Sequence, residues 1–253
     1  MAHTMKLNND VLEYLTDTKF SNGKKFLFKE KNETSITSRQ ELLTNLSKNK
    51  NVIHLGACDH IPLILKKIGE NQWLHKLLTD SAKNIIGIDI NHDAVEYCNN
   101  LGYDNIYCYD MITDADAIIS KIKTIVDNDN NQKIDYIIAG EIVEHLEDPI
   151  NFLKQINNIY ADYVECIIVT VPNILNYRYL SYAMKSIECI NTDHKYWFTP
   201  YTISKVLTIA GMKVNEIMFV GNRKSIIQRV INCTLKNKLI ISDSLICIAY
   251  LQN

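Results

Sequence analysis

Several features that define other classes of protein are missing from this sequence. No apolar run approaches the roughly 18 residues of a membrane span, and the N-terminus lacks the apolar core of a signal peptide. Lysine and arginine number 27 against 29 acidic residues, so the net charge of −2 gives no sign of a nucleic-acid-binding surface. We therefore expect a cytoplasmic protein with no membrane span and no nucleic-acid partner.

Cysteine pairs and metal-ligand spacings are also missing. The seven cysteines include no CxxC pair, and neither they nor the seven histidines show the spacing of a zinc site, so we expect no metal. Carboxylates could still hold a divalent cation, but Glu147 and Asp148 lie too close together in sequence to argue for one. Cys108, Cys166 and Cys247 lie in apolar, strand-like runs, which favours reduced core cysteines.

Short apolar runs alternate with segments of helical periodicity along most of the chain, which is 47% hydrophobic. We expect strands at residues 51–55, 85–89, 105–109, 134–139, 164–171, 213–220 and 245–251. Helices are expected at 39–48, 91–100, 114–126, 149–160 and 202–210, and residues 61–83 carry the first crossover. This alternation predicts a parallel sheet with right-handed crossovers. The stretch 221–243 shows no clear helix, which suits an antiparallel last strand.

These elements predict a single α/β domain with a Rossmann-like, doubly wound sheet of seven strands, the last one antiparallel. Residues 1–50 are polar and form an N-terminal helical segment, in which residues 1–4, before Met5, resemble a cloning remnant. Residues 51–253 form the main domain. No linker or internal repeat separates a second domain.

Polar residues follow the ends of the first strands. Asn51–Leu55 runs into a turn at Gly56, and the second strand ends on Asp89. A glycine turn followed by a carboxylate is how a doubly wound sheet binds a nucleoside, because the acid accepts hydrogen bonds from the ribose hydroxyls. Asn91 can cap the next helix, which leaves Asp89 for this role. A dinucleotide fingerprint would have three glycines, so Gly56 alone is a weak signal.

The ordered motifs resemble those of class I S-adenosylmethionine-dependent methyltransferases over roughly residues 40–253. The residues that carry the resemblance are Gly56, Asp89, Asp110, the segment Asp135–Glu141 and Val171-Pro172-Asn173. The Glu144-His145-Leu146 box and the segment from His194 through Pro200 to Ala210-Gly211 resemble the small-molecule enzymes with a Glu-His box. The first motif also looks like a subgroup associated with bacterial glycan and nucleotide-sugar tailoring.

The resemblance implies that S-adenosylmethionine is the cofactor. Gly56 would lie under its methionine moiety, Asp89 would bind the ribose, and Asp110 would meet the adenine amino group beside the backbone amide of Met111. The other residues of the expected cofactor site are Cys58, Asp59, His60, Ile90 and Glu141.

The first loop departs from the family pattern. His54 stands at the usual position of an acid, and Cys58 and His60 replace the second and third glycines. Cysteine is small enough to fit, whereas His60 has to point away or contact the ligand. Asp59 could contact the methionine ammonium. A degenerate loop that binds no cofactor remains the alternative.

The acceptor side is expected to involve the segment at about residues 173–199, which is long, rich in tyrosine and without strong periodicity. Such connections are usually lids or binding loops. A hydroxyl acceptor needs a base near neutral pH, for which His145 and His194 are the candidates, with His60 third. An amine or anionic acceptor needs none. The expected substrate contacts are Glu144, Asn173, Tyr177 and Tyr196.

The expected function is O-methylation of a small polar acceptor, such as a sugar, a sugar nucleotide or a related metabolite, in bacterial glycan or nucleotide-sugar metabolism. Two other classes share part of the pattern. A catalytically inactive binding or partner protein would explain the altered first loop. An NAD(P)-dependent oxidoreductase shares the first two motifs. Against this class, the glycine fingerprint is missing from the sequence, and Asp110 and the Glu144-His145 pair would have no role in it.

Overall fold

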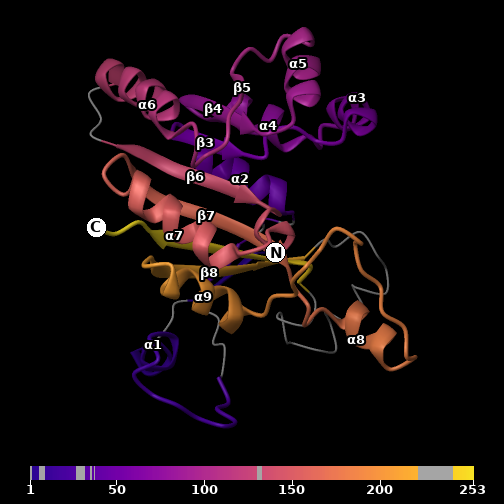
Figure 1. Cartoon of the computed structure of the whole chain (residues 1–253). Helices are drawn as coiled ribbons and strands as arrows, with labels where there is room; N and C mark the ends of the chain where they lie inside the picture. The colour runs from indigo at the N-terminus through magenta and orange to yellow at the C-terminus, as the bar shows by residue number, and fades with distance from the viewer. Residues whose placement is uncertain are drawn as a thin grey trace. The chain divides into compact units, whose positions relative to one another are not determined.

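The strands of the protein hydrogen-bond in the order β2-β1-β8-β9-β7-β6-β3-β4-β5 (Figure 1). The computed structural model describes residues 2–5, 9–26, 32–34, 36, 38–129, 133–221 and 242–253. Contacts between residues group into two units. The parallel-sheet unit comprises Gln40–Gly140, Gln155–Ile168 and Leu251–Asn253, and the antiparallel-sheet unit comprises Met1–Arg39, Glu141–Lys154 and Val169–Tyr250.

The parallel-sheet unit contains the first four strands of the predicted domain. They are β3 (Asn51–Leu55), β4 (Asn84–Asp89), β5 (Ile106–Cys108) and β6 (Ile134–Gly140). β3 pairs in parallel with β4 and β6, and β4 pairs in parallel with β5. All five residues of β3 are buried, because a central parallel strand is covered on both faces.

Helices connect these strands and can be followed from indigo to pink in Figure 1. They are α3 (Ile61–Gly69), α4 (Leu74–Ser81), α5 (His92–Asn100) and α6 (Ala115–Asp129), and α2 (Arg39–Ser47) precedes β3. The Asn91 side chain accepts a hydrogen bond from the backbone of Ala94 and caps α5. The expected cap is therefore confirmed.

A buried pair of histidines explains why β3 carries His54. The Nδ1 atoms of His54 and His75 lie 3.1 Å apart, and His75 Nε2 lies 3.3 Å from Asn105 Oδ1. Burial lowers the pKa of His75 to about 4, so it is neutral at pH 7. Its Nε2–H then donates to Asn105 and its Nδ1 accepts from His54. A side chain at Gly87 would meet His75 Cε1 at 2.6 Å, so the pair also requires glycine in β4.

The antiparallel-sheet unit holds the strands near the two ends of the chain. They are β1 (Ala2–Met5), β2 (Asn32–Thr34), β8 (Lys213–Val220) and β9 (Ser244–Tyr250). β1 pairs antiparallel with β2 and β8, and β8 pairs antiparallel with β9. The remaining elements are α1 (Asn9–Leu15), the 3₁₀ helix η1 (Val143–His145), α8 (Tyr177–Ala183) and α9 (Pro200–Ile209). α7 (Pro149–Tyr160) and β7 (Val164–Pro172) contribute residues to both units.

The predicted α/β domain is confirmed, with β3 to β9 as its seven strands and β9 antiparallel to β8. Two further strands extend the sheet. Residues 2–5 include most of the segment set aside as a cloning remnant, yet they form β1, because β8 offers an edge of unpaired backbone groups. The connection expected without a helix, 221–243, lies mostly outside the described residues. No helix in the described part is long and apolar enough to cross a membrane.

One prediction about the core cysteines is wrong. Cys166 and Cys247 are buried as expected, but Cys108 is exposed. It is the last residue of β5, the edge strand of the sheet, where an apolar sequence run does not guarantee cover on both faces.

Candidate functional site

The first loop is fixed by backbone hydrogen bonds to the end of β4. Gly56 has φ +66°, a conformation that glycine adopts without the steric cost of a side chain. The amides of Gly56 and Ala57 both donate to the carbonyl of Ile88, at 2.8 and 3.1 Å. The Asp89 carboxylate accepts hydrogen bonds from the amides of Cys58, at 2.9 Å, and Asn91, at 3.0 Å. The loop is thus rigid without a second or third glycine.

The residues at the end of β4 fit a nucleoside. Each Asp89 oxygen has a second lone pair after accepting its backbone bond. Ile90 follows directly and exposes 75% of its surface. An exposed large apolar side chain beside a carboxylate suits a ligand that has a hydroxylated ring and a flat, apolar base.

Two other residues of the first loop, Asp59 and Cys58, already make side-chain contacts within the protein. Asp59 forms an ion pair with Lys67 and accepts a hydrogen bond from the His60 amide. The Cys58 sulfur lies 3.7 Å from that of Cys98, and this contact and burial raise the pKa of the Cys58 thiol. His60 is exposed before α3 and makes no side-chain capping bond. An ammonium contact by Asp59 would compete with Lys67.

A tight turn after β5 carries the expected adenine-binding pair. Asp110 Oδ1 accepts hydrogen bonds from the amides of Ile112, at 2.8 Å, and Thr113, at 3.0 Å. Met111 is 2% exposed, and its carbonyl accepts a 2.6 Å hydrogen bond from the Tyr160 hydroxyl. The Met111 side chain is therefore part of the core, and the role of its amide toward adenine stays a prediction.

Glu141 begins the second group of predicted residues, in the antiparallel-sheet unit. It has φ +56°, which costs free energy for any residue with a side chain and is typical of functional sites. Its amide donates to the Thr170 carbonyl at 2.9 Å, and its carboxylate lies 3.5 Å from Arg39 Nε. Arg39 also donates to the Thr170 hydroxyl at 3.1 Å. The contacts with Arg39 and Thr170 thus stabilise the strained backbone conformation of Glu141.

Glu144 has a fully buried carboxylate. Neither of its oxygens has a hydrogen-bond partner among the described residues. Burial raises the pKa of Glu144 to about 8. The backbone of Glu144 itself opposes this pKa shift, whereas the nearby charge of Glu141 adds to it. The side chain is therefore mostly protonated at pH 7 when nothing is bound to it.

The two candidate histidines lie beside Glu144. One ligand atom from each of Glu144, His145 and His194 lies within 4.8 Å of the others, and we call these residues the Glu-His-His cluster. The two imidazole rings are 4.6 Å apart at 87°. His145 Nδ1 bonds to the carbonyl of Asp193 at 3.2 Å, whereas His194 Nδ1 is buried with no partner among the described atoms. Burial and the proximity of His145 lower the pKa of His194.

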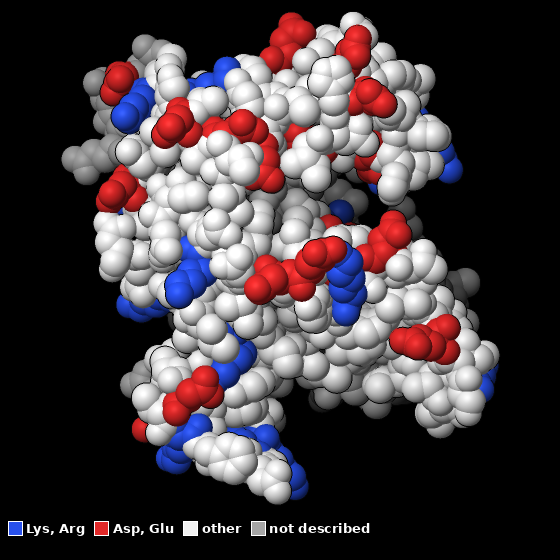
Figure 2. Space-filling model, in the orientation of Figure 1, with Lys and Arg blue, Asp and Glu red and all other residues white. Residues whose placement is uncertain are grey.

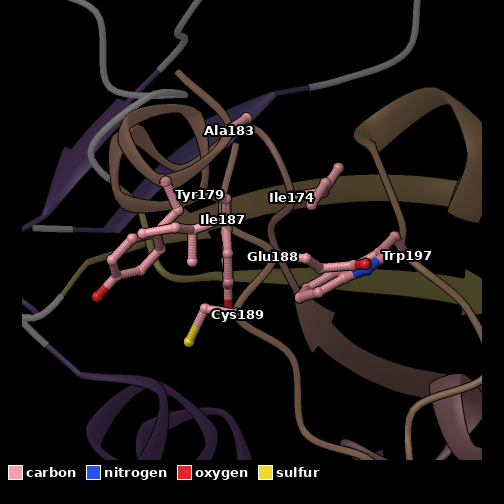
Figure 3. A pocket seen from close by; sticks show the side chains of 8 residues that line it. Ile174, Tyr179, Ala183, Ile187, Glu188, Cys189 and Trp197 are labelled. Carbon is pink, nitrogen blue, oxygen red and sulfur yellow. The ribbon is translucent and has the colours of Figure 1, made fainter. Parts of the chain in front are cut away.

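The segment 173–199 encloses a cavity of about 280 Å³ (Figure 3). It is lined by Ile174, Tyr179, Tyr182, Ala183, Ile187, Glu188, Cys189 and Trp197. The Tyr179 and Trp197 rings are 4.8 Å apart, and Trp197 lies 6.0 Å from the ring of His194. A continuous series of rings thus connects the cavity to the Glu-His-His cluster.

All four of the expected substrate contacts lie outside the cavity lining, and Glu144 belongs to the Glu-His-His cluster. Asn173 is buried, donates to the Ser242 carbonyl at 2.9 Å and accepts from the Leu175 amide at 3.1 Å. The Tyr196 hydroxyl donates to the Glu147 carbonyl at 2.9 Å, and Tyr177 is half-buried at the start of α8. Their roles toward a substrate stay predictions. Tyr179 and Tyr182, two tyrosines of the tyrosine-rich segment 173–199, share one face of α8 and line the cavity.

The chain is similar to known methyltransferases. Residues 29–217 match a family model described as a methyltransferase domain. A SAM-dependent methyltransferase from Archaeoglobus fulgidus is 20% identical, with a TM-score of 0.45 over 83% of this chain and 94% of that one. Magnesium protoporphyrin IX methyltransferase from Synechocystis PCC 6803 is 14% identical, with a TM-score of 0.47 over 83% and 78%.

The small RNA methyltransferase HEN1 is 16% identical, with a TM-score of 0.52 over 89% of this chain and 27% of that one. Among curated proteins, none matches. At these identities, likeness to solved structures shows the fold alone. The family model spans most of the chain and shows more: the chain belongs to the methyltransferase domain family and is a class I S-adenosylmethionine-dependent methyltransferase.

Proposed function

We propose that this protein transfers a methyl group from S-adenosylmethionine to a hydroxyl of a small polar acceptor, in bacterial glycan or nucleotide-sugar metabolism. The observation that carries the proposal is the Glu-His-His cluster, which ring contacts connect to an aromatic cavity. When bound, S-adenosylmethionine supplies a methyl group on a positively charged sulfur.

The parallel-sheet unit provides the residues for the cofactor. Gly56 and Cys58 would border the methionine moiety, Asp89 would accept hydrogen bonds from the ribose, and Ile90 would cover the adenine. Asp110 would meet the adenine amino group through its second oxygen. The preformed backbone bonds of Asp89 and Asp110 support these roles, because a carboxylate that is already oriented loses little entropy on binding.

The antiparallel-sheet unit provides the residues for the acceptor. Tyr179, Tyr182 and Trp197 can stack on a sugar or base ring, and Glu188 can accept hydrogen bonds from its hydroxyls. A cavity of about 280 Å³ suits a small molecule. On the face shown in Figure 2, lysine and arginine side chains are scattered and form no continuous basic stripe, which favours a small acceptor over nucleic acid.

The chemistry needs positioning and one proton transfer. The acceptor oxygen forms a bond to the methyl carbon while the carbon–sulfur bond breaks and sulfur keeps the electron pair. The hydroxyl proton passes to an imidazole nitrogen of His145 or His194. The lowered pKa of His194 keeps its imidazole neutral and able to accept a proton near pH 7.

Two measurements test the proposal. Calorimetry of the purified protein with S-adenosylmethionine, S-adenosylhomocysteine and NAD(P) should show binding of the first two alone. Release of S-adenosylhomocysteine should then be followed with a panel of sugars and nucleotide sugars, with short RNA and DNA as further samples. Turnover with one of the small acceptors supports the proposal.

Three outcomes contradict it. Binding of NAD(P) alone would favour an oxidoreductase. Binding of no cofactor would favour an inactive partner protein. Turnover with RNA or DNA but with no small acceptor would replace the proposed acceptor class.

A further inference from the structure

The Glu-His-His cluster contains polar atoms that nothing in the described structure satisfies. Glu144 is 0% exposed, and both of its carboxylate oxygens lack a hydrogen-bond partner among the described residues. His194 Nδ1 is also buried and has no hydrogen-bond partner among the described residues. Buried polar groups of this kind are costly unless they are hydrogen-bonded, paired or bound to a cation. We propose that Glu144, His145 and His194 bind one divalent transition-metal cation.

The spacing of the three ligand atoms suits a shared cation. They lie within 4.8 Å of one another. Three ligands around one ion, with bonds of about 2.0–2.2 Å to nitrogen and oxygen, lie roughly 3.3–3.8 Å from one another. The three atoms therefore have to approach one another by about 1 Å, which rotations about the side-chain bonds can supply.

The hydrogen bonds around the cluster match those of metal ligands. A ligating histidine commonly donates its other ring N–H to a backbone carbonyl or a carboxylate, which fixes the tautomer. His145 Nδ1 makes such a bond, to the Asp193 carbonyl at 3.2 Å, and this leaves Nε2 to bind the ion. The amide of Lys195 donates to the Glu144 carbonyl at 2.8 Å, so η1 and the segment that carries His194 are held together.

The ligand set indicates the class of metal. Two imidazoles and one carboxylate suit Zn²⁺, Co²⁺ or Fe²⁺ better than Ca²⁺, which prefers six to eight oxygens. Three protein ligands also leave coordination positions open, as in catalytic rather than structural sites. The site was missed in the sequence because His194 comes from a segment far from Glu144 and His145.

A role for the cation rests on the proposed function. An acceptor hydroxyl bound at an open position would lose its proton more easily, because a metal ion lowers the pKa of a bound oxygen. The two histidines would then act as ligands and not as bases, and the proton would pass to water.

The test uses the full-length protein after chelator treatment, without cofactor or acceptor. Titration with Co²⁺ should give a visible d–d absorption that saturates at one equivalent, and Zn²⁺ should displace the Co²⁺. Glu144→Gln, His145→Ala and His194→Ala should each weaken Co²⁺ binding by at least tenfold. Zn²⁺ should also raise the melting temperature of the wild type, and this shift should shrink in the variants.

Two matched controls locate the site. Glu147→Gln removes an exposed carboxylate close to the cluster in sequence, and His92→Ala removes an exposed histidine. Both should bind Co²⁺ as the wild type does. Circular dichroism identifies any variant that fails to fold, and each of the two histidine variants tests the site independently of Glu144.

Absence of saturable Co²⁺ binding to the wild type would overturn the proposal, as would cluster variants that bind as tightly as the controls. Binding is measured without turnover, so a chelated enzyme that still methylates its acceptor would leave the proposed function intact while the metal's catalytic role fails. Conversely, a protein that binds Co²⁺ but not S-adenosylmethionine would retain the metal site and lose the proposed function.

Discussion

The two groups of predicted site residues differ in how their polar atoms are satisfied. In the parallel-sheet unit, the carboxylates of Asp89 and Asp110 accept backbone hydrogen bonds, and Asp59 is ion-paired. In the antiparallel-sheet unit, both oxygens of Glu144 and Nδ1 of His194 are buried without partners among the described atoms. The carboxylates of the first group thus have hydrogen-bond or ion-pair partners without a ligand. In the second group, the free-energy cost of burying these polar atoms is not compensated by hydrogen bonds.

This difference indicates two kinds of site. A loop that is already ordered loses little conformational entropy when it binds its ligand. Unsatisfied buried groups destabilise the free protein and gain most when a ligand or ion completes them. Substitutions in the first group should therefore change cofactor affinity, and those in the second should change turnover.

The largest expected effect is on turnover, at the Glu-His-His cluster. His145→Ala and His194→Ala should each reduce kcat by roughly 10²–10⁴-fold, because each removes either a base or a ligand at the acceptor hydroxyl. S-adenosylmethionine affinity, measured by calorimetry, should stay near wild type, and Glu147→Gln should match wild type in both. If both histidine variants keep wild-type kcat, methyl transfer needs positioning alone, as for an amine or anionic acceptor.

The next effect concerns the stability of the parallel-sheet unit. Burial lowers the pKa of His75 from 6.5 to about 4, so below pH 6.5 the unfolded chain binds a proton that the folded protein excludes. Stability is present above pH 6.5 and is lost as the pH falls to about 4, by roughly 3 kcal/mol. Denaturant unfolding at several pH values measures this loss.

His75→Gln keeps an acceptor for His54 and should flatten that pH dependence. His92→Ala, at an exposed histidine, should leave it unchanged. An identical pH dependence in the wild type and His75→Gln would show that the histidine pair does not govern the stability of this unit.

The third effect is on cofactor affinity. Asp89→Ala removes a charged acceptor from the ribose hydroxyls, and a hydrogen bond to a charged group contributes about 1.5–3 kcal/mol. Calorimetry should show a ten- to hundredfold weaker affinity for S-adenosylmethionine. Asp93→Ala, at an exposed acid on α5, is the matched control. Unchanged affinity in the Asp89 variant would remove this residue from the site.

The smallest effect is on acceptor binding in the aromatic cavity. Trp197→Ala removes a stacking surface worth about 0.5–1.5 kcal/mol, so the acceptor KM should rise roughly three- to tenfold. Phe20→Ala removes an exposed aromatic ring outside the cavity lining, and it should leave KM near wild type. Equal KM changes in the two variants would argue against the cavity as the acceptor site.

The sequence predicted the regular elements well, because buried parallel strands form distinct apolar runs. β3, β7 and α7 were expected within one or two residues of their observed ends. The short strand β5 was also predicted. Its position at the edge of the sheet depends on strand pairing, which an apolar run does not show, so the prediction that Cys108 lies in the core was wrong.

Contacts between distant segments could not be predicted. His54 was an unexplained departure from the family pattern until the structure placed His75 beside it. The Glu-His-His cluster could not be predicted from the spacing of residues in the sequence, because such spacing shows only which residues are neighbours along one helix or strand. The helix α8 was missed because its apolar residues are exposed, as Leu180 is at 44%, and leave no amphipathic pattern.

The segment 173–199 is anchored at both ends by residues of its own unit. Asn173 and Asn176 bond to the Ser242 carbonyl, and the Lys195 amide bonds to the carbonyl of Glu144. The residues between these anchors supply most of the cavity wall. We therefore expect that this interior, with His194 retained, can be exchanged for that of a relative, which makes acceptor preference a property to engineer by loop grafting.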